Sequence, residues 1–145
     1  MAEHVSKWSR DPSTKCGAVI VRPDKSLAST GFNGFPRGMD DDEELYDNRE
    51  VKYDRVIHAE LNAILSAHEP VRGYTLYVWP LPTCSRCAVH VIQSGISRVV
   101  CPPISPTVRE RWGDSVDKAF DFYKEAGVAY SVMTPSAKIY KVAVE

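Results

Sequence analysis

One stretch of the sequence decides the fold. Residues 74–101 have the sequence YTLYVWPLPTCSRCAVHVIQSGISRVVC. Its first six residues are mostly aromatic or β-branched, which is typical of a strand, and residues 85–94 have the apolar spacing of a helix that ends at Gly95. Residues 98–101 again resemble a strand and stop before two prolines. A strand, a helix and a second strand in this order predict two parallel strands joined by a right-handed crossover.

Strand-like and helix-like segments alternate along the rest of the chain. Residues 16–22 and 27–32 are separated by a Pro-Asp turn, which predicts an antiparallel hairpin. Helices are predicted at 57–67 and from 107 to Gly127, and strands at 128–133 and 138–144. The order predicts an α/β fold of three layers, α/β/α, around a central mixed sheet of about five strands.

Two of the predicted helices carry detailed expectations. The spacing in 57–67 places four residues on one apolar face: Ile57, Leu61, Ile64 and Leu65. In the long helix, Thr107 and Glu110 match a capping box, and Gly113 costs about 1 kcal/mol relative to Ala, which allows a kink there. The apolar positions of that helix are Val108, Trp112, Val116, Ala119, Phe120 and Tyr123.

Composition narrows the class of protein. The chain has 145 residues with 18 Lys and Arg against 19 Asp and Glu, a net charge of −1, which suits one domain over 1–145. A near-neutral balance without a basic cluster argues against binding to nucleic acid or to a membrane surface. No apolar run is long enough to span a bilayer, and the N-terminus has no secretory signal. We therefore expect a cytoplasmic protein, in the host cytoplasm if its source is viral.

The four cysteines need a chemical explanation. Without a secretory signal they are expected to be reduced thiols or metal ligands rather than disulfides. Cys84 and Cys87 stand at i and i+3 around a predicted helix start, so both sulfurs can converge on one ion, and the helix dipole favours their thiolates. Cys16 and Cys101 lie in strand patterns and are expected to be small buried hydrophobic residues.

His58 at the start of the preceding helix would complete a zinc site. Two thiolates and one imidazole give three protein ligands and leave a fourth position for water, as in catalytic zinc sites. Glu60, two residues further on, points to another side of the helix and could reach that water. Three alternatives remain open: a redox-active Cys pair, half of a zinc knuckle, or a structural zinc whose fourth ligand is Cys16 or Cys101.

The combination of His-x-Glu with Cys-x-x-Cys is the signature of zinc deaminases, which attack C4 of cytosine or C6 of adenine. One position departs from that signature. The residue before the first Cys is Thr83, and the expected proline is one residue earlier, at Pro82. The loop before Cys84 is therefore expected to differ slightly, with the ligand set retained.

Longer motifs resemble one family within this superfamily, the deoxycytidylate deaminases. The resemblance covers roughly residues 6–101. It is carried by 8–14 (WSRDPST), 17–21 (GAVIV), 31–38 (GFNGFPRG), 58–64 (HAELNAI), 76–78 (LYV), 84–87 (CSRC) and 92–96 (IQSGI).

This resemblance implies a cytidine deaminase-like fold and the reaction of dCMP with water to give dUMP and ammonia. It implies one Zn²⁺ per chain, held by His58, Cys84 and Cys87, with Glu60 as the proton shuttle. It also implies substrate contacts: the Ala59 N–H at the base edge, Asn33 at the deoxyribose, and the segment that contains Ser9, Arg10 and Ser13 near the 5′-phosphate, with Arg10 or Lys7 as the cation.

Other positions around this site have open roles. Trp79 and Pro80 leave the strand at the mouth of the site, where Trp79 could stack on the substrate or pack against a neighbouring subunit. Family members also carry an effector site for dCTP and dTTP, which here would include Asn33, Gly34, Arg37, Gly38 and Asp42. The acidic run at 40–50 could hold Mg²⁺ for that nucleotide, or could be a solvated loop. The resemblance further implies a homo-oligomer, either a hexamer or a dimer.

Rival functions remain within and outside the enzymes. The substrate could be dCTP, a 5-substituted dCMP or free cytidine, whereas a base in nucleic acid is disfavoured by the absence of a basic stripe. A non-catalytic, zinc-stabilised binding module is the alternative of another class. Residues 1–37 carry more Lys and Arg than acids, which favours a single nucleotide as the ligand.

Overall fold

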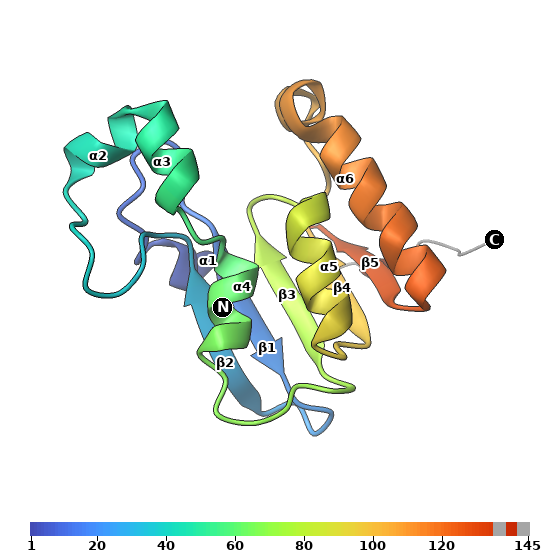
Figure 1. Cartoon of the computed structure of the whole chain (residues 1–145). Coiled ribbons are helices and arrows are strands. Elements are labelled where there is room, and N and C mark those ends of the chain that lie inside the picture. The colour runs from blue at the N-terminus through green and yellow to red at the C-terminus, as the bar shows by residue number, and fades with distance from the viewer. Residues whose placement is uncertain (135–138, 142–145) are drawn as a thin grey trace.

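A six-stranded sheet forms the centre of the fold. The computed structural model describes residues 1–134 and 139–141, and its strands are β1 (Gly17–Val21), β2 (Leu27–Phe32), β3 (Thr75–Trp79), β4 (Arg98–Cys101), β5 (Ala129–Met133) and β6 (Ile139–Lys141). Their spatial order is β2-β1-β3-β4-β5-β6, and Figure 1 shows β1 to β5. β1 runs antiparallel to β2 and β3, whereas β3, β4 and β5 are parallel. The predicted hairpin, mixed sheet and parallel second half are confirmed; of the strand predicted at 138–144, the remainder beyond β6 lies outside the described residues.

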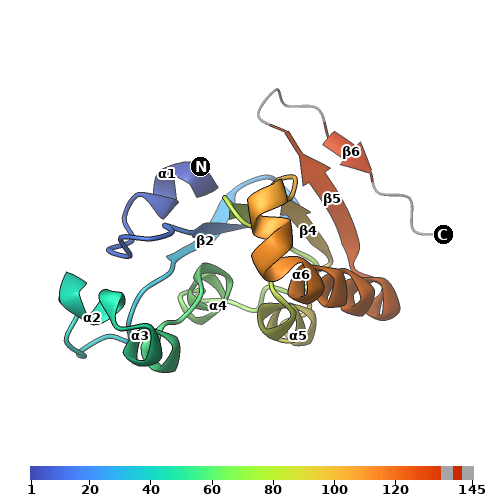
Figure 2. The same cartoon turned by 90° about the horizontal axis from the view of Figure 1, so that it is seen from above.

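Helices cover both faces of this sheet. They are α1 (Ala2–Ser6), α2 (Glu43–Asp47), α3 (Arg49–Arg55), α4 (Ala59–Leu65), α5 (Ser85–Gln93) and α6 (Pro106–Ala126). α4, α5 and α6 lie on one face and the short α1 on the other, which confirms the three layers (Figure 2). The sequence predicted neither α1 nor the pair α2 and α3. Because α2 and the start of α3 fall within it, the acidic run at 40–50 is largely helical rather than a loop. Within the described residues, no helix combines the length and the apolar character that crossing a membrane requires.

Two glycines let helices lie directly on strands. A Cβ at Gly17 would lie 2.2 Å from the Ala2 carbonyl oxygen of α1, and a Cβ at Gly31 would lie 2.2 Å from the Ala63 nitrogen of α4. Because Gly31 pairs with the residue after Gly17, the two contacts are on opposite faces of the sheet. α4 consequently packs through Ala59 and Ala63. The predicted apolar face is wrong at Leu65, which is 64% exposed.

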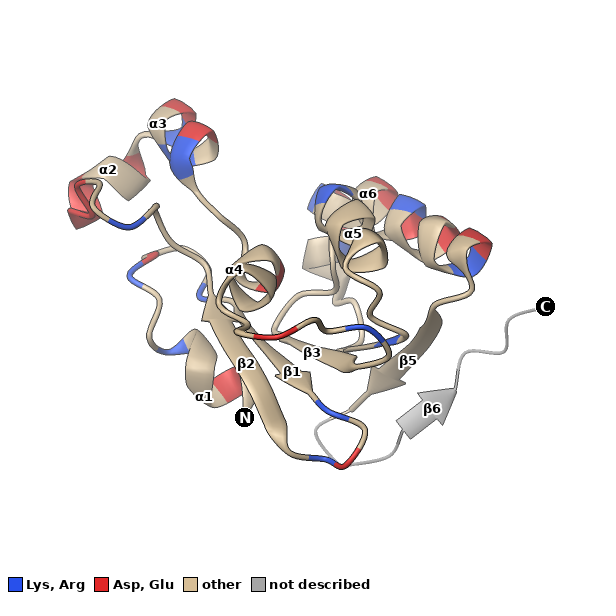
Figure 3. Ribbon diagram, turned by 60° about the horizontal axis from the view of Figure 1, so that its bottom comes forward, with Lys and Arg blue, Asp and Glu red and all other residues tan. Residues whose placement is uncertain are grey.

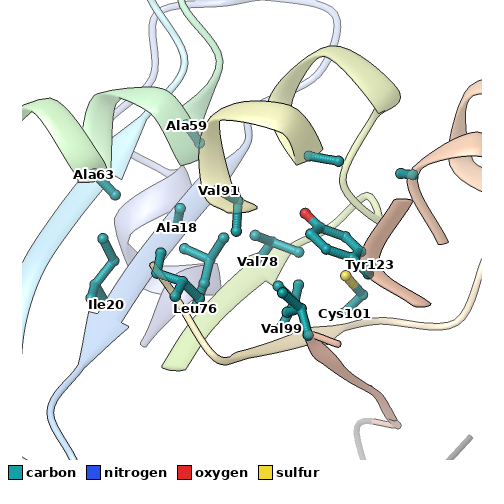
Figure 4. Close-up of a cluster of buried hydrophobic side chains, with 14 of the residues drawn as sticks. Ala18, Ile20, Ala59, Ala63, Leu76, Val78, Val91, Val99, Cys101 and Tyr123 are labelled. Carbon is teal, nitrogen blue, oxygen red and sulfur yellow. The ribbon is translucent and has the colours of Figure 1, made fainter. Parts of the chain in front are cut away.

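The hydrophobic core lies between the sheet and the helices that carry the candidate ligands (Figure 4). Its largest fully buried side chain is Tyr123 of α6. Other members come from β1, β3, β4 and α5 and include Ala18, Ile20, Leu76, Val78, Val91, Val99 and Cys101. This shared core fixes the starts of α4 and α5 relative to the edge where β3 ends.

The long helix α6 begins differently from its prediction. Its N-cap is Ser105, whose hydroxyl accepts the Val108 N–H at 3.3 Å, and Pro106 follows with the backbone angle that a first helical turn needs. The capping box predicted at Thr107 is therefore wrong, and the helix continues through Gly113 without a break. Trp112 is 41% exposed and lies outside the core.

Candidate functional site

The three candidate zinc ligands converge beside the end of β3. His58 is the N-cap of α4, Cys84 is the N-cap of α5, and Cys87 lies in the first turn of α5. His58 Nδ1 is 3.5 Å from Cys84 Sγ and 3.3 Å from Cys87 Sγ, and the three ligand atoms lie within 4.8 Å of one another. Tetrahedral zinc with Zn–S of about 2.3 Å and Zn–N of about 2.0 Å separates such atoms by about 3.5 Å. The donor set and its spacing therefore fit Zn²⁺.

The two other cysteines are separate from this group. Neither Cys16 nor Cys101 belongs to the cluster of converging ligand atoms. Cys101 is buried, as predicted, and burial raises its pKa to about 12. Cys16 is half-buried and lines the neighbouring cavity; burial, with the charge of Glu60, raises its pKa to about 12. Among the described residues, the cluster thus has three protein ligands and space for a fourth from solvent or substrate.

Hydrogen bonds within the cluster favour the thiolate form of one ligand, Cys84. Hydrogen bonding from Cys87, helped by His58, lowers the pKa of Cys84, whose sulfur also accepts the Cys87 N–H at 3.4 Å. The hydrogen bond to Cys84 in turn raises the pKa of His58. A thiolate at the positive end of α5 is the form that binds metal.

Glu60 lies beside the ligands in the first turn of α4. Glu60 is only 7% exposed and lines the same cavity as His58 and Cys84. Burial raises the pKa of its carboxyl group, and the nearby His58 opposes this shift. A carboxyl group whose pKa moves toward neutrality is suited to accept and donate protons.

A cavity of about 350 Å³ opens from this cluster, a volume that suits a small ligand. Of the predicted substrate contacts, Ser13, Asn33, Ala59 and Trp79 line it, whereas Ser9, Arg10 and Pro80 do not. Asp11, in the segment predicted near the phosphate, also lines it. Residues that the sequence did not suggest for the site line it as well, among them Thr14, Arg49, Lys52, Val108, Arg111, Trp112 and Val116. The walls thus come from the N-terminal loop, α3 and α6 as well as from the predicted elements.

Two predicted residues lie behind or beside the cavity. Ser9 is 2% exposed, and its hydroxyl donates to the Asn33 carbonyl oxygen at 2.8 Å, so it supports the wall from behind. Arg10 donates to the Asp41 carbonyl oxygen at 3.2 Å and faces the Asp41 carboxylate at 3.7 Å. Its side chain is 61% exposed and is held away from the cavity by that pair.

Cations other than Arg10 line the cavity. Arg49 and Lys52 of α3 and Arg111 of α6 line the cavity, and Figure 3 shows basic positions on both helices. Two of these cations lie over aromatic rings: Arg49 is 5.6 Å from the Tyr53 ring centre and Arg111 is 5.8 Å from that of Trp112. α3 and the start of α6 stand on either side of the site (Figure 1). The sequence could not place these residues together, because it predicts no helix over 49–55.

The predicted effector loop has its own internal contacts. Phe35 stacks on the buried Tyr46 with ring centres 4.1 Å apart, and the Tyr46 hydroxyl donates to Asp41 at 2.6 Å. Asp40 accepts the Asp42 N–H at 3.2 Å. Of the residues predicted for an effector, Asn33 alone is among those lining the substrate cavity. A regulatory nucleotide with Mg²⁺ at this loop stays a prediction.

Comparison with known proteins gives a consistent result. Residues 1–102 match the model of the cytidine and deoxycytidylate deaminase zinc-binding region. The chain is 44% identical to an uncharacterized deaminase in the luxG 3′ region of Aliivibrio fischeri, over 88% of this chain and 85% of that protein. It is 36% identical to the deoxycytidylate deaminase of Mus musculus, over 88% of this chain and 72% of the mouse protein.

A solved structure has the same architecture. It is the dCMP deaminase of the cyanophage S-TIM5 in complex with dCMP and dUMP, with a TM-score of 0.72 and 27% identity. The match covers 91% of this chain and 90% of the phage chain. The predicted α/β fold thus has a solved counterpart over nearly its whole length.

Proposed function

Because this chain belongs to the cytidine and deoxycytidylate deaminase family, we propose that it hydrolyses dCMP to dUMP and ammonia. The observation that carries the proposal is the convergence of His58, Cys84 and Cys87 beside a cavity that the buried Glu60 lines. The phage relative, solved with dCMP and dUMP, supports a nucleotide of this type as substrate.

The chain's own groups can be assigned to the steps of this reaction. His58, Cys84 and Cys87 would hold one Zn²⁺, which supplies the acidity that makes a water molecule nucleophilic near neutral pH. Glu60 would accept a proton from that water at its carboxylate and deliver it to N3 of cytosine as oxygen attacks C4. Glu60 would then carry the second proton, from the hydroxyl now on C4, to the departing amino group, so that the C4–N4 bond breaks, the C4 carbonyl forms and ammonia leaves. The Ala59 N–H, at the free N-terminal end of α4, would orient the base edge.

The cations that line the cavity favour a phosphorylated substrate. Arg49 and Arg111 approach from opposite helices, and both line the cavity that contains Glu60. Lys52 is already engaged by a buried carboxylate, that of Asp11. We therefore assign the 5′-phosphate to Arg49 and Arg111 rather than to Arg10 or Lys7, because guanidinium groups suit phosphate oxygens.

The deciding experiment is a kinetic comparison of dCMP, dCTP, deoxycytidine and cytidine with zinc-loaded protein. Among the four substrates, dCMP is expected to have the highest kcat/KM. Equal turnover of cytidine would overturn the nucleotide assignment, and faster turnover of dCTP would move the activity to the triphosphate. Absence of turnover on all four with one zinc per chain would favour a binding module.

A further inference from the structure

A buried ion pair lies in the wall of the substrate cavity. Lys52 Nζ of α3 is 2.8 Å from Asp11 Oδ2 and 3.0 Å from Asp11 Oδ1. The two side chains are only 16% and 2% exposed. A carboxylate buried to this degree is stable as an anion only when it is paired and hydrogen-bonded, so Asp11 depends on Lys52.

Asp11 organises the surrounding loop. Its Oδ1 accepts the N–H groups of Ser13 at 2.8 Å and Thr14 at 3.3 Å, which closes the turn that forms one side of the cavity. Its Oδ2 accepts a hydrogen bond from Asn33 Nδ2 at 3.3 Å. One carboxylate therefore connects α3, the N-terminal loop and the residue that follows β2.

The hydrogen bonds of Asn33 leave one hydrogen-bonding position of its side-chain amide unused. Its Nδ2 donates to Asp11 and, at 3.0 Å, to the Thr14 carbonyl oxygen, while its Oδ1 accepts the Cys16 N–H at 2.8 Å. An amide nitrogen has two hydrogens and an amide oxygen has two lone pairs. Asn33 lines the cavity, so the remaining lone pair of Oδ1 is what it can offer to a ligand. A partner of Asn33 must therefore be a hydrogen-bond donor, such as a hydroxyl group.

α3 itself has little other attachment to the rest of the fold. Within residues 1–134 and 139–141, it packs on α2 and on no other helix or strand, and it stands away from the sheet in Figure 1. It has no buried residue among its seven. The ion pair from Lys52 to Asp11 is thus the polar contact that brings α3 against the cavity wall.

We propose that Lys52 is a positioning residue for recognition of the sugar. It holds Asp11, and through Asp11 it keeps the Asn33 amide turned so that Oδ1 accepts a hydrogen bond from the 3′-hydroxyl, the one free hydroxyl of dCMP. The inference rests on the proposed function for the identity of the ligand. It does not make Lys52 a contact of the phosphate or of the reacting atoms.

The test compares two substrates that differ only in this hydroxyl, dCMP and 2′,3′-dideoxycytidine 5′-monophosphate. For Lys52→Met, KM for dCMP is expected to rise about tenfold, the value of one ordinary hydrogen bond, with kcat little changed. KM for the dideoxy substrate, which lacks the donor, should change less than about threefold by the same reasoning. Lys118→Met, an exposed lysine of α6, serves as the matched control and should leave both substrates unchanged.

Lys52→Arg keeps a cation beside Asp11 and guards against a variant that does not fold. Because the guanidinium is longer and planar, KM for dCMP is expected to rise about threefold, without a matching rise for the dideoxy substrate. Equal losses on both substrates, for either variant, would overturn the proposal. Selective loss on phosphorylated substrates relative to deoxycytidine would instead assign Lys52 to the phosphate, which also overturns it.

A second measurement is independent of turnover. Hydrogen exchange of the zinc-loaded, nucleotide-free protein should be faster in Lys52→Met at 49–55 and at Ser13 and Thr14, whose N–H groups Asp11 holds. Unchanged exchange there would overturn the positioning role even if the protein deaminates dCMP. Faster exchange in a protein that does not act on dCMP would leave the ion-pair role standing and refute the proposed substrate.

Discussion

Tyr123 of α6 donates a hydrogen bond from its hydroxyl to Thr83 Oγ1 over 3.0 Å inside the core. Both residues are almost fully buried, at 0% and 1% exposure, and Thr83 directly precedes the candidate ligand Cys84. This bond accounts for the departure from the deaminase signature at this position. A hydroxyl at residue 83 ties the loop before Cys84 to α6, which a proline could not do.

The bond gives a prediction for stability. Tyr123→Phe leaves a buried hydroxyl at Thr83 without its donor and is expected to lower the free energy of unfolding by about 1–3 kcal/mol. Thr83→Val should cost a similar amount, because it leaves the buried Tyr123 hydroxyl without its acceptor. The double variant should lose less than the sum, and urea unfolding of all four proteins measures this coupling. Strict additivity would show that the two hydroxyls do not interact.

Glu60→Gln separates catalysis from metal binding. The amide keeps the shape of the side chain but cannot carry the proton, so kcat for dCMP is expected to fall at least about 10²–10⁴-fold. Zinc, measured by atomic absorption, should remain near one per chain, because Glu60 is not among the three converging ligands. Activity within a few-fold of the unaltered protein would refute the proton-carrying role.

Removal of zinc should change the reactivity of two thiols out of four. With zinc bound, a disulfide reagent at pH 8 is expected to react slowly with all cysteines. After chelation Cys84 should react first, because hydrogen bonding from Cys87, helped by His58, lowers its pKa. Cys87 should follow more slowly, because the hydrogen bond to Cys84 and burial raise its pKa. Cys16 and Cys101, whose pKa values are raised to about 12 mainly by burial, stay protonated at pH 8. Cys101, which is buried, should react only on unfolding, whereas Cys16, which is half-buried and lines the cavity, should react slowly.

Mass spectrometry of the labelled peptides identifies the cysteines in each kinetic phase. Rapid labelling of Cys16 in the zinc-loaded protein would contradict its raised pKa. A reversible Cys84–Cys87 disulfide in a protein that retains no metal would favour the redox alternative.

Arg111→Met tests the phosphate assignment. Loss of a charged hydrogen bond to phosphate should lower kcat/KM for dCMP by about 10- to 100-fold and leave deoxycytidine nearly unchanged. Arg109→Met is a matched control from the same helix, since Arg109 pairs with Asp117 at 2.8 Å and does not line the cavity. A loss of equal size on the nucleoside would show that Arg111 supports the cavity wall and does not bind phosphate.

The parts that could be predicted from the sequence were the local ones. Short spacings were sufficient for the candidate ligands, because His58 and Glu60 lie at the start of one predicted helix and Cys84 and Cys87 at the start of the next. α3 was missed because it buries no residue and therefore has no apolar stripe to detect. Its one local signal was Asn48, whose side chain accepts the Val51 N–H as an N-cap.

Contacts between distant residues could not be predicted in this way. Lys52 and Asp11 are 41 residues apart, and nothing near either one indicates the other. The packed face of α4 was misjudged at Leu65 for the same reason, because the deciding partner is Gly31 in a strand that precedes it in the chain. Periodicity within one helix does not reveal how close its neighbour can come.

The contact of Gly31 with α4 has a further consequence for how this sequence can vary over time. α4 carries His58 and Glu60, and its distance from the sheet is set by direct contact between the backbone of Gly31 and the backbone of α4. Exchanges among the aliphatic side chains of the core can therefore accumulate while the height of α4 above the sheet is preserved. Position 31 itself has no such freedom, because the smallest added side chain would displace the helix. Amino-acid substitutions are thus tolerated among the core side chains but not at Gly17 and Gly31, two positions without side chains.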